Sequence, residues 1–452
     1  MEEPSKRKLL VLITNHFAAI NLIHTGFIQK LADKYSVQIL SDFIQEADIV
    51  KINRYFEIQL TLVSISFGKE PPVLRLLRLF EKFLFFNLFK ANTHRVKLLE
   101  QSIFIRRVVH GLGWLIGSGM LARWLLNFVR KAIILLSSRI AQPGLPNPGL
   151  AGVISSSPLD SRENAIVNRL ARQKVPALAI IISWDNLTSK GMINANHDYV
   201  LVWNEVMKCE FENFYSGFQP IPRICVTGVP RFDVYVKRKP NEISLLNFKR
   251  KLSISGSADI ILFATSAPRH FPNQRHIVED LLEYCKRRLN TILLIRLHPA
   301  DQLAYYKEYL SERTVRVCRS SACTSLPELN FLDLLTDTIY SCTVCVQVAS
   351  TMRLDAAACG KPVVNIGYDG NEELPYSQSV RRLYDYSHQL PLNAFKVGKL
   401  VLSKQELFDH LDQVLRKRSQ SAFTQAALSA HAPIQAGGSV SRMMRYVDEW
   451  LA

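Results

Sequence analysis

Short runs of consecutive apolar residues recur along this chain, and segments with helical spacing of apolar positions follow them. The first run, residues 8–14 (KLLVLIT), precedes the amphipathic segment NLIHTGFIQKLADKY and a second run, SVQILSD. Continuous apolar runs of this length indicate strands buried on both faces, as in a parallel sheet covered by helices. The further runs predicted as strands are residues 151–156, 175–183, 198–204, 258–266, 290–299, 314–320, 343–350 and 361–367.

These runs form two sets, separated by residues 219–240. That stretch contains four prolines and clustered basic residues, a composition typical of a turn-rich connection. A chain of 452 residues is also too long for one ordinary hydrophobic core. The pattern therefore predicts an α/β protein with two doubly wound, Rossmann-like domains.

Residues 72–140 break this pattern. They are predicted to form apolar helices inserted after the second strand, and they contain twelve lysines and arginines against two glutamates. Basic residues interleaved with Phe, Trp, Leu and Ile are typical of helices that lie on an anionic lipid surface. The alternative is that these helices only cover the N-terminal sheet, with their arginines extended to solvent. On the membrane hypothesis, lipid binding depends on Arg106, Arg107, Arg130 and Lys131.

Composition and charge narrow the possible partners. Hydrophobic residues make up 48% of the chain and charged residues 21%, which is typical of a globular protein. The net charge of +17 favours anionic partners such as nucleic acid, acidic lipid or phosphate-bearing substrates. We expect no nucleic-acid partner, because the basic residues concentrate among apolar helices without the aromatic patterns of RNA-binding modules.

The sequence also makes predictions about location. The N-terminal residues MEEPSKRKLLVLITNHF show no apolar leader before the first strand, and no window reaches about 18 uncharged apolar residues. Eight scattered cysteines indicate a reducing compartment. We therefore predict a cytoplasmic protein that is peripheral on the inner face of a membrane. The pattern does not indicate an oligomeric state.

Four of the cysteines have a spacing compatible with zinc. Cys318, Cys323, Cys342 and Cys345 form C-x4-C-x18-C-x2-C. Cys345, however, lies in an apolar run, where free cysteine commonly packs in a core. We therefore expect core packing here, with no metal and no cofactor.

The candidate ligand-binding residues follow the predicted strands, because doubly wound sheets bind ligands beyond the carboxyl ends of their strands. In the C-terminal half these positions carry hydroxyls, arginine and histidine, which suit an anionic ligand. They are Thr265, Ser266, Arg269, Arg296, His298, Ser350 and Thr351.

The segment VASTMRLDAAACG (348–360) has the composition of a nucleotide site. Ser350 and Thr351 precede a predicted helix, whose unpaired N–H groups and dipole attract anions. The hydroxyls either donate to a phosphate or simply cap the helix. Asp355 lies four residues after Thr351, on the same helix face, and is expected to accept hydrogen bonds from a ribose. No G-x-x-x-x-G-K-[ST] loop and no D-x-D motif is present, so arginine, histidine and the helix N-terminus are expected to neutralise the phosphates.

At this point the sequence resembles a known superfamily. LLIRLHP (293–299) and VASTMRLDAAACGKPVVNI (348–366) are similar to the C-terminal domain of GT-B type glycosyltransferases. The most similar groups are capsule and surface-polysaccharide transferases, CDP-glycerol glycerophosphotransferases and, more distantly, UDP-GlcNAc 2-epimerases. VTGVPRFD (226–233) resembles the start of their second domain, and GGSVSRMMRYVDEWL resembles their final helix. The resemblance covers roughly residues 175–450.

This resemblance implies two Rossmann-like domains that face a cleft. The implied boundaries are an acceptor-side domain at 1–225, a nucleotide-donor domain at 226–435, and a terminal helix at 436–452 that packs back on the first domain. It further implies that Arg296, His298, Ser350 and Thr351 contact the donor phosphates. Asp355 stands where many members carry an acidic residue that contacts the ribose. The E-x7-E pattern of many retaining members is absent, and the stereochemical outcome stays open.

Transfer to an acceptor hydroxyl requires a general base, and two candidates follow N-terminal strands. His16 follows the first strand, and Asp185 lies in the polar stretch IISWDNLTSKG. Both residue types also occur in turns and helix caps. Asn186, Thr188 and Lys190 of the same stretch are candidate acceptor-side contacts.

The function expected from these features is a metal-independent GT-B type glycosyltransferase in surface-polysaccharide synthesis. It moves a sugar from a nucleotide-activated donor to a glycan or lipid-linked acceptor. The alternatives are a glycerol- or polyol-phosphotransferase with a CDP-activated donor, an enzyme like UDP-GlcNAc 2-epimerase and, less favoured, a non-enzymatic nucleic-acid binder.

Overall fold

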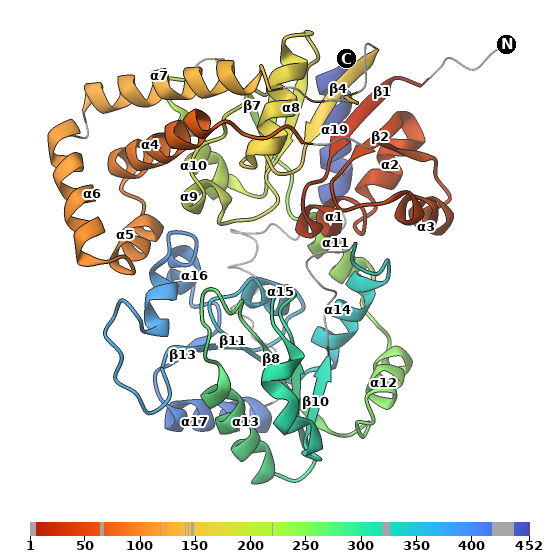
Figure 1. Ribbon diagram of the computed structural model, residues 1–452. Coiled ribbons are helices and arrows are strands. Elements are labelled where there is room, and N and C mark those ends of the chain that lie inside the picture. Colours follow the sequence, from red (N-terminus) through yellow and green to blue (C-terminus); the bar gives the residue numbers. More distant parts are fainter. Residues whose placement is uncertain are drawn as a thin grey trace. The chain divides into compact units, whose positions relative to one another are not determined.

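The structure is a computed structural model, and it describes residues 6–63, 67–117, 119–140, 142, 144–145, 149–218, 220–318, 326–417 and 438–452. The chain divides into two compact units. Unit 1 comprises Met1–Pro230, Thr324–Leu329 and Gly438–Ala452, and unit 2 comprises Arg231–Cys323 and Asn330–Gly437. In each unit, helices flank a central sheet (Figure 1).

Within its described residues, unit 1 has a seven-stranded parallel sheet in the order β3-β2-β1-β4-β5-β6-β7. The strands are β1 (Lys8–Leu12), β2 (Ser36–Leu40), β3 (Leu60–Val63), β4 (Leu150–Ser155), β5 (Ala177–Ile180), β6 (Tyr199–Val202) and β7 (Arg223–Val226). The helices of the sheet layers are α1 (His16–Leu22), α2 (Phe27–Lys34), α3 (Glu46–Phe56), α8 (Ser161–Ala171), α9 (Asn186–Ser189), α10 (Glu205–Tyr215) and α19 (Ser439–Leu451).

The described part of unit 2 has a six-stranded parallel sheet in the order β10-β9-β8-β11-β12-β13. Its strands are β8 (Asp259–Ala264), β9 (Thr291–Arg296), β10 (Val315–Cys318), β11 (Val344–Gln347), β12 (Val363–Ile366) and β13 (Lys399–Val401). The helices are α11 (Pro230–Lys237), α12 (Glu242–Lys251), α13 (Arg275–Lys286), η1 (Leu303–Ser311), α14 (Phe331–Ser341), α15 (Met352–Ala358), η2 (Val380–Asp385), α16 (Leu390–Ala394) and α17 (Lys404–Lys417).

Both faces of the unit 1 sheet are buried. Successive side chains of a strand point to opposite faces. Leu9 and Val11 of β1 belong to one hydrophobic cluster, whereas Leu10 and Leu12 belong to another. A continuous apolar sequence is therefore required in β1, because both of its faces are buried. The two parallel sheets, with helices on their faces, confirm the prediction of two doubly wound α/β sheets.

The strands that the apolar pattern did not predict are β3, β7 and β13, and each lies at the edge of its sheet. An edge strand has one neighbour and is more exposed, so its sequence is short and interrupted by polar residues. β7 (RICV) lies inside the proline-rich stretch 219–240, which therefore contributes a strand to unit 1 before α11 begins.

The final helix, α19, belongs to unit 1. Its buried residues Val440, Met443, Met444 and Val447 join the same hydrophobic cluster as β1. Trp450 covers Gly152 of β4 so closely that a Cβ at position 152 would lie 2.3 Å from the indole ring. Glycine is therefore required in β4 because an aromatic ring occupies the space of its side chain.

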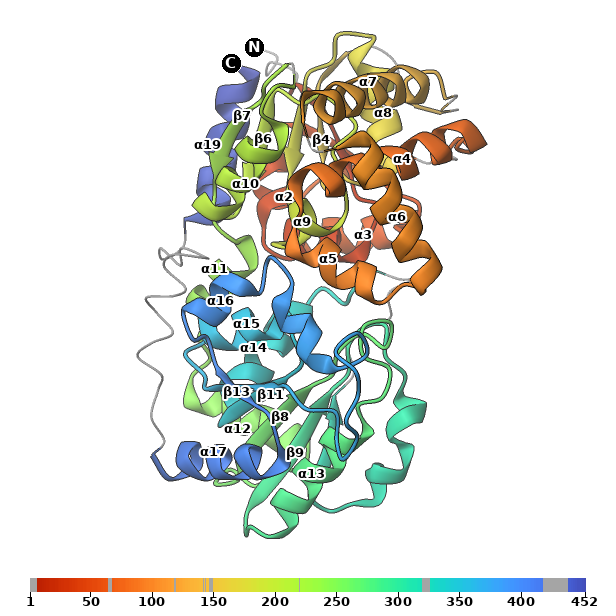
Figure 2. The same cartoon turned by 90° about the vertical axis from the view of Figure 1, so that its left-hand side faces the viewer.

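The predicted helical insertion is present and consists of α4 (Pro72–Phe89), α5 (Asn92–Leu99), α6 (Ile103–Ile116) and α7 (Met120–Ser137). It follows β3, and not the second strand as predicted, because β3 was missed. α4 and α7 pack against each other, and α7 also packs on α8 (Figures 1 and 2). Among the described residues, no helix is both long enough and apolar enough to cross a membrane.

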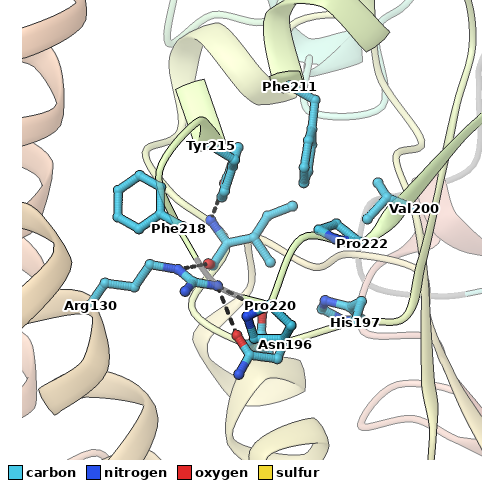
Figure 3. Close-up of a pocket in the computed structure, with 11 residues that line it drawn as sticks. Arg130, Asn196, His197, Val200, Phe211, Tyr215, Phe218, Pro220 and Pro222 are labelled. Atoms are coloured by element: carbon cyan, nitrogen blue, oxygen red, sulfur yellow. Dashed lines mark hydrogen bonds between the residues drawn. The ribbon is translucent and has the colours of Figure 1, made fainter. Parts of the chain in front are cut away.

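Arg130 of α7 was expected to face lipid, and this prediction is wrong. Its side chain is buried, and Nε donates to the carbonyl of Ile193 at 3.1 Å. Nη2 donates to the carbonyl of Ala195 at 3.3 Å and to Oδ1 of Asn196 at 3.1 Å (Figure 3). A neighbouring pocket of about 20 Å³ has room for about one water molecule. Arg130 therefore anchors the insertion to unit 1, since carbonyl oxygens stabilise its buried charge.

Candidate active site

The donor-binding candidates of unit 2 follow three neighbouring strands. Arg296, Ala264 and Gln347 occupy equivalent register positions on β9, β8 and β11. His298, Thr265 and the pair Ser350–Thr351 lie one to four residues beyond this level, at one edge of the sheet. Adjacent strands are about 4.8 Å apart, so the axes of β9 and β11 are separated by about 10 Å. The topology therefore brings the imidazole and the hydroxyl pair to the same edge.

His298 is oriented by its own loop. The backbone N–H of His298 donates to Oγ1 of Thr265 at 2.8 Å, which joins the ends of β9 and β8. Nδ1 of His298 accepts from the backbone N–H of Ala300 at 3.0 Å. In the neutral ring the proton must then be on Nε2, which makes Nε2 a hydrogen-bond donor.

The loop after β8 is held by a residue that sequence reasoning missed. Oε1 of Gln274 accepts from the N–H of Ser266 at 2.7 Å, and Nε2 donates to the carbonyl of Ser266 at 2.9 Å. Thr265 and Ser266 are buried, whereas Arg269 is exposed in the same loop. The sequence gives no signal for this role of Gln274, because its partner is the backbone of Ser266, eight residues away.

Arg296 points to a different place from the one expected. Its side chain is buried, its Nη1 lies 3.5 Å from Oγ1 of Thr338, and its guanidinium stacks on Phe331. Thr338 and Phe331 both belong to α14. The side chain of Arg296 is therefore directed to the face of the sheet that α14 covers, and not beyond the end of β9. A contact between Arg296 and a donor phosphate stays a prediction that this geometry does not favour.

The loop before α15 has an unusual backbone. Ala349 has φ = 41°, a left-handed conformation that is unfavourable for a residue with a Cβ. Its N–H donates to the hydroxyl of Tyr384 at 3.2 Å, and its carbonyl accepts from Nε2 of Gln389 at 2.9 Å. Oε1 of Gln347 accepts from the N–H of Ser350 at 2.6 Å. Three buried side chains thus impose the conformation that places the hydroxyl pair.

The two hydroxyls have different roles in the structure. Oγ of Ser350 accepts from the N–H of Met352 at 3.3 Å, so this residue caps the helix. Within the described residues, the side chain of Thr351, the N-cap of α15, forms no capping bond. Both side chains are half-buried. The capping alternative therefore accounts for Ser350 but leaves the position of Thr351 unexplained.

Asp355 does not face this edge of the sheet. The residue is buried, and its carboxylate lies 3.0 Å from Nε of Arg231 and 2.9 Å from the hydroxyl of Tyr235, both on α11. Burial raises the pKa of Asp355, and the charge of Arg231 opposes that shift. The geometry assigns Asp355 to an internal ion pair that joins α15 to α11, and the expected ribose contact is not favoured. Sequence reasoning missed Arg231 and Tyr235, whose partner is more than 100 residues away.

His16 is the first residue of α1, directly after β1. The side chain of the N-cap residue Asn15 accepts from the N–H of Ala18 at 2.9 Å, and its Nδ2 donates to Oγ of Ser157 at 2.6 Å. Burial lowers the pKa of the half-buried His16 imidazole, so the ring is neutral near pH 7. A neutral imidazole is able to accept a proton, as a general base must.

A buried carboxylate that sequence reasoning missed contacts the loop that leads from β1 to His16. Glu163 of α8 is fully buried and accepts from Oγ1 of Thr14 and Oγ of Ser155, both at 2.6 Å, and from the N–H of Ser157 at 2.8 Å. Burial raises the pKa of Glu163 to about 7, although these hydrogen bonds lower it. Glu163 therefore connects the ends of β1 and β4. The serine run 155–157 was the available signal for such a site.

Asp185 lies at the same edge of the unit 1 sheet as His16, and β4 separates their strands. Its two carboxylate oxygens accept from Oγ of Ser183 at 2.5 Å and from Oγ of Ser189 at 3.0 Å. The carboxylate thus stabilises its own turn, as in the structural alternative, and its role as a base stays a prediction. The acceptor-side candidates Asn186 and Thr188 are buried, and Lys190 is exposed.

No group of three or more potential metal ligands occurs among the described residues. Cys318, Cys342 and Cys345 are buried free thiols, and Cys323 lies outside the described residues.

Glu163 leads to a prediction about pH. Its pKa is raised in the folded state, so the stability linked to it is complete below about pH 4.5 and is lost as the pH rises through about 7. We expect this group to lower the free energy of unfolding of the wild type by up to about 3 kcal/mol over that range, relative to Glu163→Gln. Tryptophan fluorescence in urea at pH 5 and pH 8 measures the effect on unit 1, because all five tryptophans belong to that unit. A difference between the two proteins that is the same at both pH values contradicts this prediction.

A comparison with protein families gives a match over more than half of the chain. The profile of the family described as CDP-Glycerol:Poly(glycerophosphate) glycerophosphotransferase matches residues 185–449. This range includes Asp185 and every donor-binding candidate of unit 2, but not His16. No curated protein matches the chain.

Solved structures with low sequence identity are similar to this chain over nearly its whole length, and the first two of those named here have the same fold. The UDP-GlcNAc 2-epimerase of Neisseria meningitidis, bound to UDP-GlcNAc, is 14% identical with a TM-score of 0.56, and the match covers 98% of this chain and 100% of that one. A glycosyltransferase of Rickettsia africae is 11% identical with a TM-score of 0.52 over 99% of each chain. The wall teichoic acid polymerase TagF is 11% identical with a TM-score of 0.48, over 99% of this chain and 89% of that one.

Proposed function

The chain belongs to the CDP-glycerol:poly(glycerophosphate) glycerophosphotransferase family, and we propose that it transfers a glycerol phosphate or related polyol phosphate unit from a CDP-activated donor. The acceptor is a growing glycan or a lipid-linked chain in surface polymer synthesis. The observation that carries this proposal is the sheet edge of unit 2, where His298 and the Ser350–Thr351 loop flank the end of β8. A sugar from a nucleotide-sugar donor is the second candidate, and the GT-B fold supports it.

The donor is held by its phosphates. Nε2–H of His298 donates to a phosphate oxygen, and the hydroxyl of Thr351 forms the opposite side of the anion site. The rigid backbone at Ala349 keeps these donors in place without reorganisation when the ligand binds. Negative charge increases on the leaving nucleotide as its bond to the transferred group breaks. The hydrogen-bond donors that bind its phosphates therefore lower the activation barrier of the transfer.

The acceptor hydroxyl is activated by His16. The neutral imidazole takes the hydroxyl proton while the oxygen attacks the glycerol-bearing phosphorus, and the bond from that phosphorus to CMP breaks. CMP leaves with the electron pair. With a sugar nucleotide, the attack is at the anomeric carbon and the nucleotide leaves with its phosphates. Asp185 remains the alternative base, although two serines already bind its carboxylate.

An epimerase is the remaining alternative among enzymes. The similarity to UDP-GlcNAc 2-epimerases is a similarity of fold, because sequence identity is 14% or less in those structures. An epimerase needs acids around an enclosed sugar site, whereas Asp355 and Glu163 are engaged in internal contacts. Release of free nucleotide that depends on an acceptor separates a transferase from an epimerase.

We further propose that the enzyme works on the cytoplasmic face of a membrane. Every described cysteine is a free thiol, as in a reducing compartment. A lipid-linked acceptor is confined to a bilayer, and the basic, apolar insertion 72–140 suits an anionic surface.

Nucleotide binding tests the proposed function. We expect CDP and CMP to raise the thermal transition of the whole protein by several degrees, because a ligand at about 100 times its Kd adds about 2.7 kcal/mol to stability. UDP and GDP serve as matched nucleotides. Acceptor-dependent release of CMP from CDP-glycerol is the expected activity. Selective stabilisation by UDP with release of UDP from a UDP-sugar favours the second candidate, and no response to any nucleotide contradicts both.

A further inference from the structure

Helix α6 is apolar and yet almost entirely outside the core. All of its 14 residues are described, and none is buried. Seven of its large apolar side chains are 43% to 84% exposed: Ile103, Phe104, Ile105, Val108, Leu112, Trp114 and Leu115. Figures 1 and 2 show α6 at the outer margin of unit 1, between α5 and α7. A soluble protein rarely leaves so much contiguous apolar surface in water without a binding partner.

The outer face of α7 continues this surface. Met120, Trp124 and Phe128, four residues apart along one side of the helix, are 61% to 89% exposed, and the rings of Trp124 and Phe128 stack at 5.8 Å. The opposite side of α7 is buried through Leu126, Val129 and Ile133. The outer apolar stripe is therefore not needed to pack α7 on unit 1. We call the exposed apolar residues of α6 together with Met120, Trp124 and Phe128 the α6–α7 surface.

Charge restricts what binds this surface. Residues 103–137 contain no aspartate or glutamate, and Arg107, Arg123 and Lys131 are exposed among the apolar side chains. Apolar residues surrounded by cations, with tryptophans near the α6–α7 corner, are typical of helices at the headgroup boundary of an anionic bilayer. Arg130, in contrast, belongs to the interior and contributes nothing to this charge.

A second copy of the chain does not complement the charges of the α6–α7 surface. In a symmetric dimer the surface meets a copy of itself, so the two facing surfaces would both carry the cations Arg107, Arg123 and Lys131. Neither helix offers a carboxylate to pair with them. A flat protein partner covers one side of a helix, whereas α6 is exposed and apolar around most of its circumference. A bilayer surrounds such a helix on several sides at once.

We propose that α6 and the outer face of α7 insert side-on into the headgroup–acyl boundary of an anionic bilayer. A helix of this kind lies in the membrane plane with its apolar side chains about 5–10 Å deep. The inference deepens the proposed function, because it names the residues that hold the enzyme on the membrane. It rests on that function only in its reason for the contact, which is access to a lipid-linked acceptor. The lipid contact itself is measured without donor or acceptor.

The test is sedimentation of the full chain with vesicles of phosphatidylcholine that contain a quarter phosphatidylglycerol. The first variant carries Phe104→Ser, Trp114→Ser and Trp124→Ser. The matched control carries Ile243→Ser, Leu289→Ser and Tyr305→Ser, which replace exposed apolar side chains of unit 2. We expect the wild type and the control to bind and the first variant to bind at least about 10-fold more weakly, with unchanged thermal transitions. Equal binding of the two variants, or no binding of the wild type, overturns the proposal.

A second variant tests the charge. Arg107→Glu, Arg123→Glu and Lys131→Glu together are expected to abolish binding to the anionic vesicles, and added salt is expected to weaken binding of the wild type. Binding that is equally strong on pure phosphatidylcholine overturns the anionic part of the proposal. Concentration-dependent dimers that disappear in the serine variant, without vesicle binding, assign the surface to a second copy and overturn it. Turnover with a water-soluble acceptor is expected to be normal in both variants, so loss of lipid binding and failure of the proposed function are distinguishable.

Discussion

His298→Ala is expected to weaken donor binding about 10- to 100-fold while the protein keeps its fold. The Nδ1 atom of His298 already accepts from the N–H of Ala300, so the proposed function assigns the contact with the donor phosphate to Nε2–H. A hydrogen bond to a charged group contributes about 1.5–3 kcal/mol, which corresponds to that loss in affinity. His298 is half-buried, so its removal leaves no large cavity.

Calorimetric titration with CDP measures the effect of His298→Ala. Ser350→Ala combined with Thr351→Ala is expected to cause a similar loss, because it removes the hydroxyls on the other side of the anion site. Ser311→Ala, at an exposed serine that precedes the start of β10 and therefore lies at the opposite edge of the sheet, is the matched control and is expected to bind as the wild type does. Undiminished CDP binding in the His298 and Ser350–Thr351 variants refutes the assignment of the phosphate site.

Asp355→Ala is expected to destabilise unit 2 by about 3–5 kcal/mol. The side chains of Arg231 and Asp355 are 3% and 5% exposed, and their facing atoms are 3.0 Å apart. Removal of the carboxylate leaves a buried guanidinium without its counter-charge, and Tyr235 loses its acceptor. Such a loss is a large fraction of the stability of an ordinary domain.

Far-UV circular dichroism in urea measures this destabilisation, with tryptophan fluorescence as a separate record of unit 1. Glu312→Ala is the matched control, since its ion pair with Lys286 is exposed and is expected to contribute about 1 kcal/mol or less. Arg231→Met with Asp355→Leu is expected to recover much of the stability, because both charges are then absent. Full stability of Asp355→Ala together with weak nucleotide binding instead supports the ribose contact expected from the sequence.

The comparison of β1 with β13 shows how far the apolar pattern determines the fold. β1 is central and buried on both faces, so its sequence is continuously apolar and predicts a strand without further information. β13 is a three-residue edge strand with two exposed side chains, and only its pairing with β12 makes it a strand. Central strands are determined by their own residues, whereas edge strands depend on a neighbour.

The candidate site also shows what the local sequence determines and what depends on neighbouring residues. His298, Ser350 and Thr351 were predicted to bind a ligand because doubly wound sheets bind ligands beyond the carboxyl ends of their strands, and the structure places them at that edge. Arg296 was selected by the same rule, and Asp355 by its helical spacing from Thr351, but their side chains are directed to internal partners, Thr338 and Arg231. Strand order and helix spacing predict where a residue lies along an element, but the direction of a side chain depends on what packs against it.

The sequence by itself determined two doubly wound sheets and the helical insertion, and it placed the candidates for an anion site after the strands of the second sheet, because hydrophobic period and strand ends are local properties of the chain. Only the tertiary structure decided that Arg130 is an internal anchor, that Glu163 joins the ends of β1 and β4, and that α6 is left apolar and uncovered. Each of these facts depends on contacts between residues distant in sequence, where burial and the availability of a partner set the energy of a charged or apolar side chain.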